Sequence, residues 1–337
     1  MVAVAGREVR LSNPDKVFFS KRGETKLDTA EHYLALEEPV MRALGGRATM
    51  LQRFPDGASG KSFYQKRVPR SPPEWLQTTT VATVNGTTSE ALVLADMAHV
   101  VWAVNLGVLG FHPWPYQADR PEVNDELRLD LDPQPGTNFE MARETAAEVK
   151  DLLDEAGIVS WPKTTGSKGI HVHVHLEPQW SSYQVRAAAV TMARRLAARR
   201  PDLITDRWWK EERGARIFID FNQNAPHKTV FGAWSVRSRV GGQVSTPFGW
   251  SELASIQPEE LTIATVVDRV DRDGDPWEAK NDAPQSIQAF VDEFDAHIAD
   301  GGFDEPWPPV YPKMPHEPSR VAPSRARSEP DEPPAEN

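Results

Sequence analysis

Leu127-Arg-Leu-Asp130-Leu-Asp132-Pro133 is the stretch of this sequence that indicates both a fold and a chemistry. Leucines alternate with polar residues, which is typical of a β-strand with one buried face. Side chains two positions apart lie on the same face of a strand, so Asp130 and Asp132 are expected to project together. Two carboxylates this close repel each other unless a cation lies between them. Because Mg²⁺ and Mn²⁺ prefer oxygen ligands, the pair predicts metal-assisted phosphoryl or nucleotidyl transfer.

Two further segments support this chemistry. Arg216-Ile-Phe-Ile-Asp220 reads as a second strand that ends on a carboxylate. A third acidic ligand completes a site for two divalent cations, the arrangement used for in-line displacement at phosphorus. Between the two strands, Lys163-Thr-Thr165-Gly-Ser167-Lys168-Gly-Ile-His171 forms a turn rich in glycine, hydroxyls and lysine. Such a turn is suited to bind a triphosphate, although it lacks the P-loop pattern of many ATPases.

His171, His173 and His175 alternate along the strand that follows this turn. Their side chains share one face but spread over about 13 Å, too far to converge on one zinc ion. His171 is therefore expected at the triphosphate, and the other two histidines are expected to be structural.

Composition limits the class of protein. A chain of 337 residues can form one large domain or two smaller ones. The absence of cysteine excludes disulfides, thiolate zinc sites and cysteine nucleophiles. No apolar run approaches the roughly 20 residues needed to cross a bilayer, and the N-terminus lacks a signal-peptide core. These features predict a cytoplasmic protein without a membrane partner.

Charge is distributed unevenly along the chain. Residues 1–70 carry 13 Lys and Arg against 8 Asp and Glu, hence +5, and the net charge of −11 leaves −16 for the remainder. Aromatic residues interleave with these cations in Ser62-Phe63-Tyr64-Gln-Lys66-Arg67. Cations beside stackable rings suit unpaired nucleotides. The alternative interpretation is a solvated basic face with core aromatics.

The pattern of elements predicts an α+β protein. Helices are expected over 28–44 (capped by Asp28 or Thr29 and interrupted by Pro39), 95–109, 138–156, 182–200 and 286–299. Strands are expected over 48–54, around the turn Asn85-Gly86 within 78–92, and over 158–161, 170–176, 216–221 and 230–236. The order lacks a regular βαβ rhythm and a Gly-x-Gly-x-x-Gly loop, which favours an antiparallel or mixed sheet over a dinucleotide-binding fold.

The domain organisation follows from composition. Residues 1–305 are expected to form one catalytic domain of two interleaved subdomains. From about Pro306 the chain is rich in Pro, Ser, Arg and Glu, so 306–337 is expected to be a mostly disordered tail.

In combination, these motifs resemble the polymerase domain of bacterial ligase D, in its stand-alone actinobacterial form, a member of the archaeo-eukaryotic primase superfamily. The resemblance runs from Leu11-Ser-Asn-Pro-Asp-Lys16 to Pro-Lys-Met-Pro near residue 315, and includes Ser-Val-Arg237-Ser-Arg. It implies an RRM-like catalytic sheet packed against a second α/β subdomain. Thr165 stands where serine is usual and Tyr64 replaces a phenylalanine; a hydroxyl and a ring are retained.

The resemblance also implies a role for each matching residue. The catalytic residues would be His112 and the metal ligands Asp130, Asp132 and Asp220. The nucleotide would be bound by Thr165, Ser167, Lys168, His171, Arg237 and Arg213. DNA would be bound by Lys16 and Lys26 at a 5′-phosphate, and by Arg53, Phe63 and Tyr64 at the template.

The expected function is template-dependent nucleotidyl transfer with two divalent cations, Mn²⁺ or Mg²⁺. The family implies filling of short gaps or broken ends that carry a 5′-phosphate, in DNA repair by end joining, with NTPs preferred over dNTPs. Ku and a separate DNA ligase are candidate partners, and a monomer associated with the nucleoid is expected. Two alternatives stay open: a non-catalytic DNA-end scaffold for Ku or a ligase, and a different metal-dependent phosphotransferase or hydrolase.

Overall fold

Strand β8 (Asn124–Pro133), which contains the aspartate pair, is the central strand of a five-stranded sheet. The computed structural model describes residues 1–238 and 241–321. In this first sheet β8 is flanked by β12 (Ile217–Asp220) and β10 (Ile170–Trp180), with β11 (Ile204–Thr205) and β9 (Trp161–Thr164) at the edges. The pairs are antiparallel except for β11 with β12. The expected α+β architecture is therefore confirmed.

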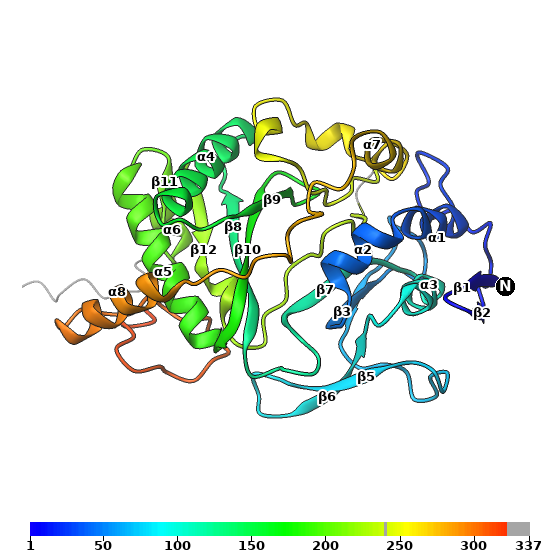
Figure 1. The fold of residues 1–337 in the computed structure, drawn as a ribbon, viewed down its shortest axis with the longest axis horizontal. Helices are drawn as coiled ribbons and strands as arrows, with labels where there is room; N and C mark the ends of the chain where they lie inside the picture. The colour runs from blue at the N-terminus through cyan, green and yellow to red at the C-terminus, as the bar shows by residue number, and fades with distance from the viewer. Residues whose placement is uncertain (239–240, 322–337) are drawn as a thin grey trace, which may run out of the picture.

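The two faces of β8 differ in chemistry, as the alternation predicts. Leu127, Leu129 and Leu131 are fully buried in the main hydrophobic core. That core includes apolar residues of helices α4 (Phe139–Glu155) and α5 (Ser182–Arg199), and helix α8 (Gln288–Ala299) packs on α5 (Figure 1). The other face of β8 carries Glu126, Arg128, Asp130 and Asp132. The apolar face therefore anchors the sheet while the opposite face is left for polar chemistry.

A second five-stranded sheet lies beside the first and is built from the N-terminal part of the chain (Figure 1). Strand β3 (Arg47–Arg53) pairs with β7 (Val108–Gln117) on one side, and with β4 (Phe63–Gln65) and β6 (Thr88–Val93) on the other. Strand β5 (Thr78–Ala82) completes a hairpin with β6 around Asn85-Gly86, as predicted. Contacts between β7 and β8 join the two sheets.

Shorter elements complete the described chain. They are the hairpin of β1 (Val2–Val4) and β2 (Arg7–Val9), the helices α1 (Lys26–Ala35), α2 (Glu37–Leu44), α3 (Met97–Asn105), α6 (Lys210–Arg213) and α7 (Val266–Asp273), and the 3-10 turns η1 (Phe221–Asn224), η2 (Trp250–Glu252) and η3 (Pro258–Glu260). None of the helices among the described residues is long and apolar enough to cross a membrane.

Several boundaries differ from the sequence predictions. The first helix begins at Lys26, not Asp28, because Thr25 caps it and Asp28 closes a capping box with Thr25. The break between α1 and α2 falls at Leu36; Pro39 lies in the first turn of α2, where its missing N–H costs little. The strand expected over 158–161 begins instead at Trp161.

Two regions were assigned wrongly. The sequence did not predict β7, because Pro113 and Pro115 are rare inside strands. These prolines are tolerated because, among the described strands, β7 pairs only with β3; elsewhere its backbone bonds a loop, where the Gly232 N–H donates to the Phe111 carbonyl (2.8 Å). Conversely, the strand expected over 230–236 is a loop held by the isolated bridge of Val236 with Val244.

The boundary expected at residue 306 does not separate packed from unpacked chain. Trp307 and Tyr311 are 3% and 6% exposed and form a small core with Ala225. Residues 303–321 therefore pack against the body of the protein, because these large rings bury enough apolar surface to offset the prolines around them. The rest of the predicted tail, 322–337, lies outside the described residues.

Candidate active site

Three aspartates occupy neighbouring positions on the polar face of the first sheet. Asp220 at the end of β12 pairs in register with Asp130 on β8, and Asp132 lies two residues beyond Asp130. Register partners and residues two apart point to the same side of a sheet, so the three side chains share one face. The sequence analysis predicted this grouping from two separate segments, and β8–β12 pairing brings them together.

These carboxylates are held where negative charge is costly. Burial raises the pKa of Asp130 to about 6, although the nearby charges of Lys163 and Arg237 act in the opposite direction. Burial and the charge of Asp130 together raise the pKa of Asp220 to about 6. The pKa of Asp132 is raised for the same two reasons. The site is therefore short of positive charge.

Each carboxylate accepts from or touches a local partner. Gln134 Nε2 donates to Asp132 Oδ2 (3.0 Å), Gln223 Nε2 donates to Asp220 Oδ2 (2.7 Å), and His171 Nε2 lies 3.2 Å from Asp130 Oδ1. Within the described parts of the chain, no group of three or more His, Asp or Glu side chains already surrounds a point that could hold an ion. The donor chemistry nevertheless fits a divalent cation, since three crowded carboxylates lack a matching charge.

The turn after β9 lies against the same face. Thr165 is buried, and its hydroxyl accepts from the Gly169 N–H (3.2 Å) while its own N–H donates to the Gly169 carbonyl (3.0 Å). Glycine is required at Gly166, which has φ +67°, and at Gly169, where a Cβ would lie 2.6 Å from the Leu131 carbonyl oxygen. Lys168 at the tip is exposed. The turn is thus rigid at its base and presents a cation to solvent.

Basic side chains line the site beside this turn. Arg237 Nε donates to the Thr165 carbonyl (2.8 Å), and its guanidinium stacks 3.5 Å from the Phe231 ring centroid. His171 pairs in register with Asp130, and burial lowers its pKa well below the usual value, helped by the charges of Lys163 and Arg237. His171 is therefore neutral at physiological pH.

A pocket of about 360 Å³ opens over this assembly. Its lining includes the predicted site residues Asp130, Asp132, Thr165, Ser167, Lys168, His171 and Arg237. The lining combines carboxylates (Asp130 and Asp132) with cations (Lys168 and Arg237), which suits a metal-bound triphosphate.

His112 and Arg213 lie near different residues of the site. His112 is 7% exposed on β7, and burial with the charges of Arg237 and Lys163 lowers its pKa to about 3. Its Nε2 has no hydrogen-bond partner among the described residues. Arg213 stacks on Phe218 and donates to Gln134 Oε1 (3.3 Å) and to two backbone carbonyls. In this structure Arg213 thus supports the glutamine that contacts Asp132.

The predicted DNA-binding residues lie on the second sheet and its helices. Lys26 is 5% exposed, and its Nζ donates to the Ser12 (2.7 Å) and Asn105 (3.2 Å) carbonyls. Burial and then the charge of Lys16 lower the pKa of Lys26, so the two ammonium groups are close. Lys16 donates to the Pro55 carbonyl. The charges of the two lysines therefore influence each other, and their binding of a 5′-phosphate stays a prediction.

Strand β4 carries two adjacent exposed rings, which point to opposite faces of the strand. Phe63 and Tyr64 are 46% and 56% exposed, and the Arg53 guanidinium lies 5.1 Å from the centre of the Phe63 ring. The Tyr64 ring meets the His112 ring edge-on at 5.2 Å. Tyr64 therefore lies at the rim of the active site, and Phe63 lies with Arg53.

Some residues at the site were not identified from sequence. Lys163 is fully buried, its pKa is lowered strongly by burial and then by Arg237, and its Nζ donates to Ser245 Oγ. Gln134 and Gln223 follow their aspartates by two and three residues. A glutamine just after an acidic strand end is the signal that sequence reasoning could have used for these two.

A match to one family covers most of the chain. Residues 25–277 match the family model described as the LigD primase-polymerase domain. The chain is 32% identical over 293 residues to the multifunctional non-homologous end joining protein LigD of Mycobacterium bovis, covering 84% of this chain and 38% of that protein. It is 32% identical over 272 residues to the bifunctional LigD of Bacillus subtilis, covering 80% of this chain and 44% of that protein. The chain thus spans less than half the length of these relatives.

A solved structure agrees with the sequence matches. The polymerase domain of Mycobacterium tuberculosis ligase D in complex with DNA superimposes with a TM-score of 0.77 at 30% identity. The superposition covers 82% of this chain and 99% of that domain. The similarity therefore extends over the whole of the solved domain, in agreement with the primase-type fold expected from sequence.

Proposed function

The chain belongs to the LigD primase-polymerase family, and on that basis we propose that it is a template-dependent DNA/RNA polymerase. The observation that carries the proposal is the common face of Asp130, Asp132 and Asp220 beside a basic pocket. Carboxylates alone would suit many phosphotransferases. The exposed rings of Phe63 and Tyr64 at the rim favour a nucleic-acid substrate over a small molecule.

The three aspartates would hold two divalent cations, Mn²⁺ or Mg²⁺. When bound, such ions lower the pKa of a hydroxyl nucleophile and neutralise charge on a triphosphate. The raised pKa values of Asp130 and Asp220 support this assignment, because a bound cation would offset the cost of burying their negative charge.

The basic and hydroxyl side chains that line the pocket would bind the incoming nucleotide. Lys168 and Arg237 supply positive charge, and the Thr165 and Ser167 hydroxyls can donate to phosphate oxygens. Neutral His112 and His171 can each donate one N–H at the reacting phosphate. None of these groups reads base identity, so selection of the base would come from pairing with the template.

The biological substrate would be DNA with a short gap or a broken end. The related proteins are named for non-homologous end joining, and the solved relative is a complex with DNA. Lys16 and Lys26, whose charges influence each other, would bind a 5′-phosphate. Following the family, we expect NTPs to be preferred and Mn²⁺ to be favoured. Ku and a separate ligase are the candidate partners in that pathway.

A gap-filling assay tests this proposal. Wild-type protein is given a labelled primer across a short gap, with NTPs or dNTPs and with Mg²⁺ or Mn²⁺. Asp130→Ala or Asp220→Ala should abolish extension while DNA binding, measured by fluorescence anisotropy, stays within about twofold, because the proposed DNA contacts are made by the N-terminal cations and rings and not by the aspartates. Near-normal extension by either variant would rule out this site.

The same assay separates the alternatives. A scaffold would bind gapped DNA without incorporating any nucleotide, and a hydrolase would release phosphate without lengthening the primer. Lys16→Ala should remove the preference for a 5′-phosphorylated gap and leave extension of an unphosphorylated primer-template unchanged. An unchanged preference would contradict the phosphate pocket alone.

A further inference from the structure

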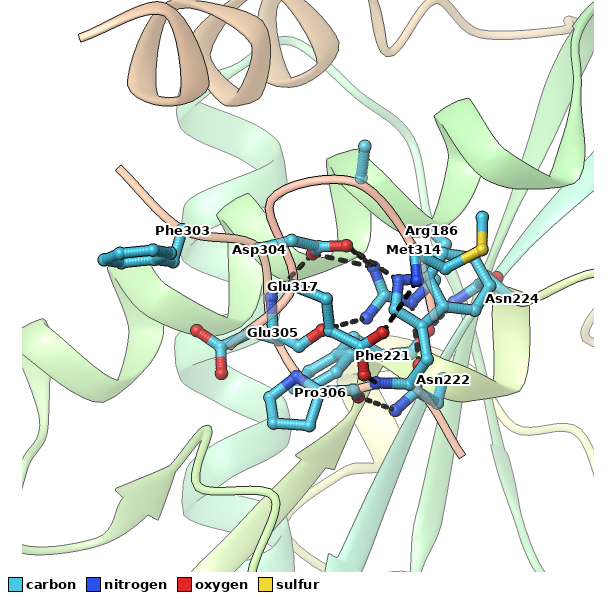
Figure 2. Close-up of polar contacts among 12 residues, drawn as sticks. Arg186, Phe221, Asn222, Asn224, Phe303, Asp304, Glu305, Pro306, Met314 and Glu317 are labelled. Carbon is cyan, nitrogen blue, oxygen red and sulfur yellow. Dashed lines mark hydrogen bonds and ion pairs between the residues drawn. The ribbon is translucent and has the colours of Figure 1, made fainter. Parts of the chain in front are cut away.

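The segment 303–321, which follows helix α8, crosses α5 and the turn η1 (Figure 2). We call this segment the clasp. The clasp contacts Arg186 of α5, a residue that is 1% exposed. Arg186 Nη1 donates to both carboxylate oxygens of Asp304 (2.9 and 3.0 Å), and Nη2 donates to the Glu305 carbonyl (3.0 Å). The guanidinium also lies 3.9 Å from the centre of the Trp307 ring.

Asn222 in η1 is hydrogen-bonded both to Arg186 and to the clasp. Arg186 Nε donates to Asn222 Oδ1 (2.7 Å), and Asn222 Nδ2 donates to the Pro306 carbonyl (3.1 Å) (Figure 2). Asn222 is 1% exposed, so water cannot substitute for either bond. The clasp therefore fixes the position of this residue.

The turn that contains Asn222 orients Asp220. The Asn222 backbone N–H donates to Asp220 Oδ1 (3.1 Å), and Gln223 donates to Asp220 Oδ2. The far end of the turn is tied to the sheet by Asn224, whose side chain exchanges hydrogen bonds with the backbone of Arg128 (2.9 and 2.7 Å). One end of η1 thus depends on β8, and the Asp220 end depends on the clasp.

The ion pair between Arg186 and Asp304 indicates a role in orientation more than in stability. A buried Arg–Asp pair is weak evidence for stability, because apolar residues of similar volume often stabilise as well. A planar guanidinium with donors in a fixed fork instead imposes direction. Arg186 bonds Asp304, which lies 118 residues later in the sequence, and also bonds Asn222 in η1. Asp220, the third aspartate of the active site, immediately precedes η1.

We propose that Arg186, Asn222 and Asp304 are positioning residues, and that the clasp sets the orientation of Asp220 toward the active-site face. This inference rests on the proposed function, since it takes Asp220 as a metal ligand. Loss of the grip lets η1 shift and turns Asp220 away from Asp130 without removing any carboxylate. Supporting residues of this kind change metal affinity by about 10–100-fold when mutated.

Mn²⁺ binding by isothermal titration calorimetry tests the proposal without relying on activity. Asn222→Ala should weaken Mn²⁺ binding at the aspartates by about tenfold or more. Primer extension should then be restored by raising the Mn²⁺ concentration, with kcat near the wild-type value. Arg195→Ala is the matched control, because Arg195 is on the same helix and pairs with Glu293 of α8 but does not contact the clasp.

A milder variant covers the case in which Asn222→Ala fails to fold. Asp304→Glu keeps a carboxylate beside the buried Arg186, so it should keep the fold, while its longer side chain displaces the clasp and still weakens Mn²⁺ binding. If a folded variant, judged by its thermal melt, binds Mn²⁺ within twofold of wild type, the clasp has no positioning role. If the wild-type protein itself binds no Mn²⁺, the two-metal function fails, which is a different result.

Discussion

Strand β8 carries acidic residues at both ends, and the two ends are treated in opposite ways. At its start, Asp125 pairs with Arg47 (2.6 Å), and Glu126 pairs with Arg128 and Lys280 (both 2.6 Å). Although burial by itself raises their pKa values, these cations lower both below the usual values. At its end, Asp130 has a pKa raised to about 6 and contacts only a neutral histidine closely.

The difference distinguishes structural from functional charge on a single strand. Glu126 and Asp130 lie on the same face, four residues apart, opposite His175 and His171 of β10. The charge of Glu126 is balanced by Arg128 and Lys280, whereas the charge of Asp130 is available to a bound cation. Carboxylates whose charge the fold does not balance mark a site for a bound cation.

The largest effect is expected at the balanced end. Lys280→Met removes a cation that is 1% exposed and leaves Glu126 with less compensation in a buried place. Breaking a buried pair in this way costs about 3–5 kcal/mol of unfolding free energy. Urea denaturation measures it. The exposed Arg195–Glu293 pair is the control, and Arg195→Ala should cost less than about 1 kcal/mol.

The next effect is expected from adding the missing charge at the other end. Free Mn²⁺ at a hundred times its dissociation constant should raise the unfolding free energy of wild-type protein by about 2.7 kcal/mol. Thermal denaturation with and without Mn²⁺ measures this. The same addition to Asp130→Asn should change stability little, and an equal gain in that variant would place the ion elsewhere.

Removing the unbalanced charge should itself stabilise the metal-free fold. A pKa raised from 3.8 to about 6 means that ionised Asp130 destabilises the folded state, and the penalty grows as the pH rises through that window. The Asp130 side chain is still 21% exposed, so solvent screening reduces this destabilisation of the folded state to about 1–2 kcal/mol. Asp130→Asn should gain this amount at pH 7 and nothing below pH 3.8.

Glu126→Gln provides the contrast for that measurement. The same exchange of a carboxylate for an amide at the balanced end should lower the unfolding free energy, because Lys280 and Arg128 lose their partner. Equal signs for the two variants, measured by denaturation at pH 7, would break the comparison between the two ends of β8.

The smallest effect is expected from His173, which pairs in register with Arg128. Burial lowers its pKa to about 3, although the Glu126 charge acts in the opposite direction. The folded protein then resists protonation, so stability is complete above pH 6.5 and is lost as the pH falls toward 3. At pH 5.5 the loss is about 1.4 kcal/mol. Between pH 8 and pH 5.5, the unfolding free energy of His173→Leu, measured by denaturation, should therefore fall by about 1.4 kcal/mol less than that of the wild type.

The local parts of the site could be predicted from sequence. Alternation placed Asp130 and Asp132 on one face, and the acidic end of a second strand identified Asp220. The helices 139–155 and 182–199 were predicted within one or two residues of their bounds, because Asn138 caps the first and Pro201 follows the second.

What could not be predicted depends on contacts between distant segments. Strand β7 contains Pro113 and Pro115, and only its place at the edge of β3 makes them acceptable. The segment after residue 306 has the composition of a disordered tail, yet Trp307 packs on Arg186. Nothing local in the sequence connects these two residues.

The burial of Trp307 and Tyr311 also bears on how far this chain can be shortened. A version that ended at residue 305, where composition alone would cut, would lose Trp307 and Tyr311, expose the apolar surface of Ala225 that they cover, and leave the Asn222 amide without an acceptor. Such a fragment should be prone to aggregation and to digestion by trypsin at newly accessible arginines. Any shortened form intended for crystals or assays is better ended beyond Arg320, whose guanidinium donates to the Tyr311 carbonyl and closes the segment.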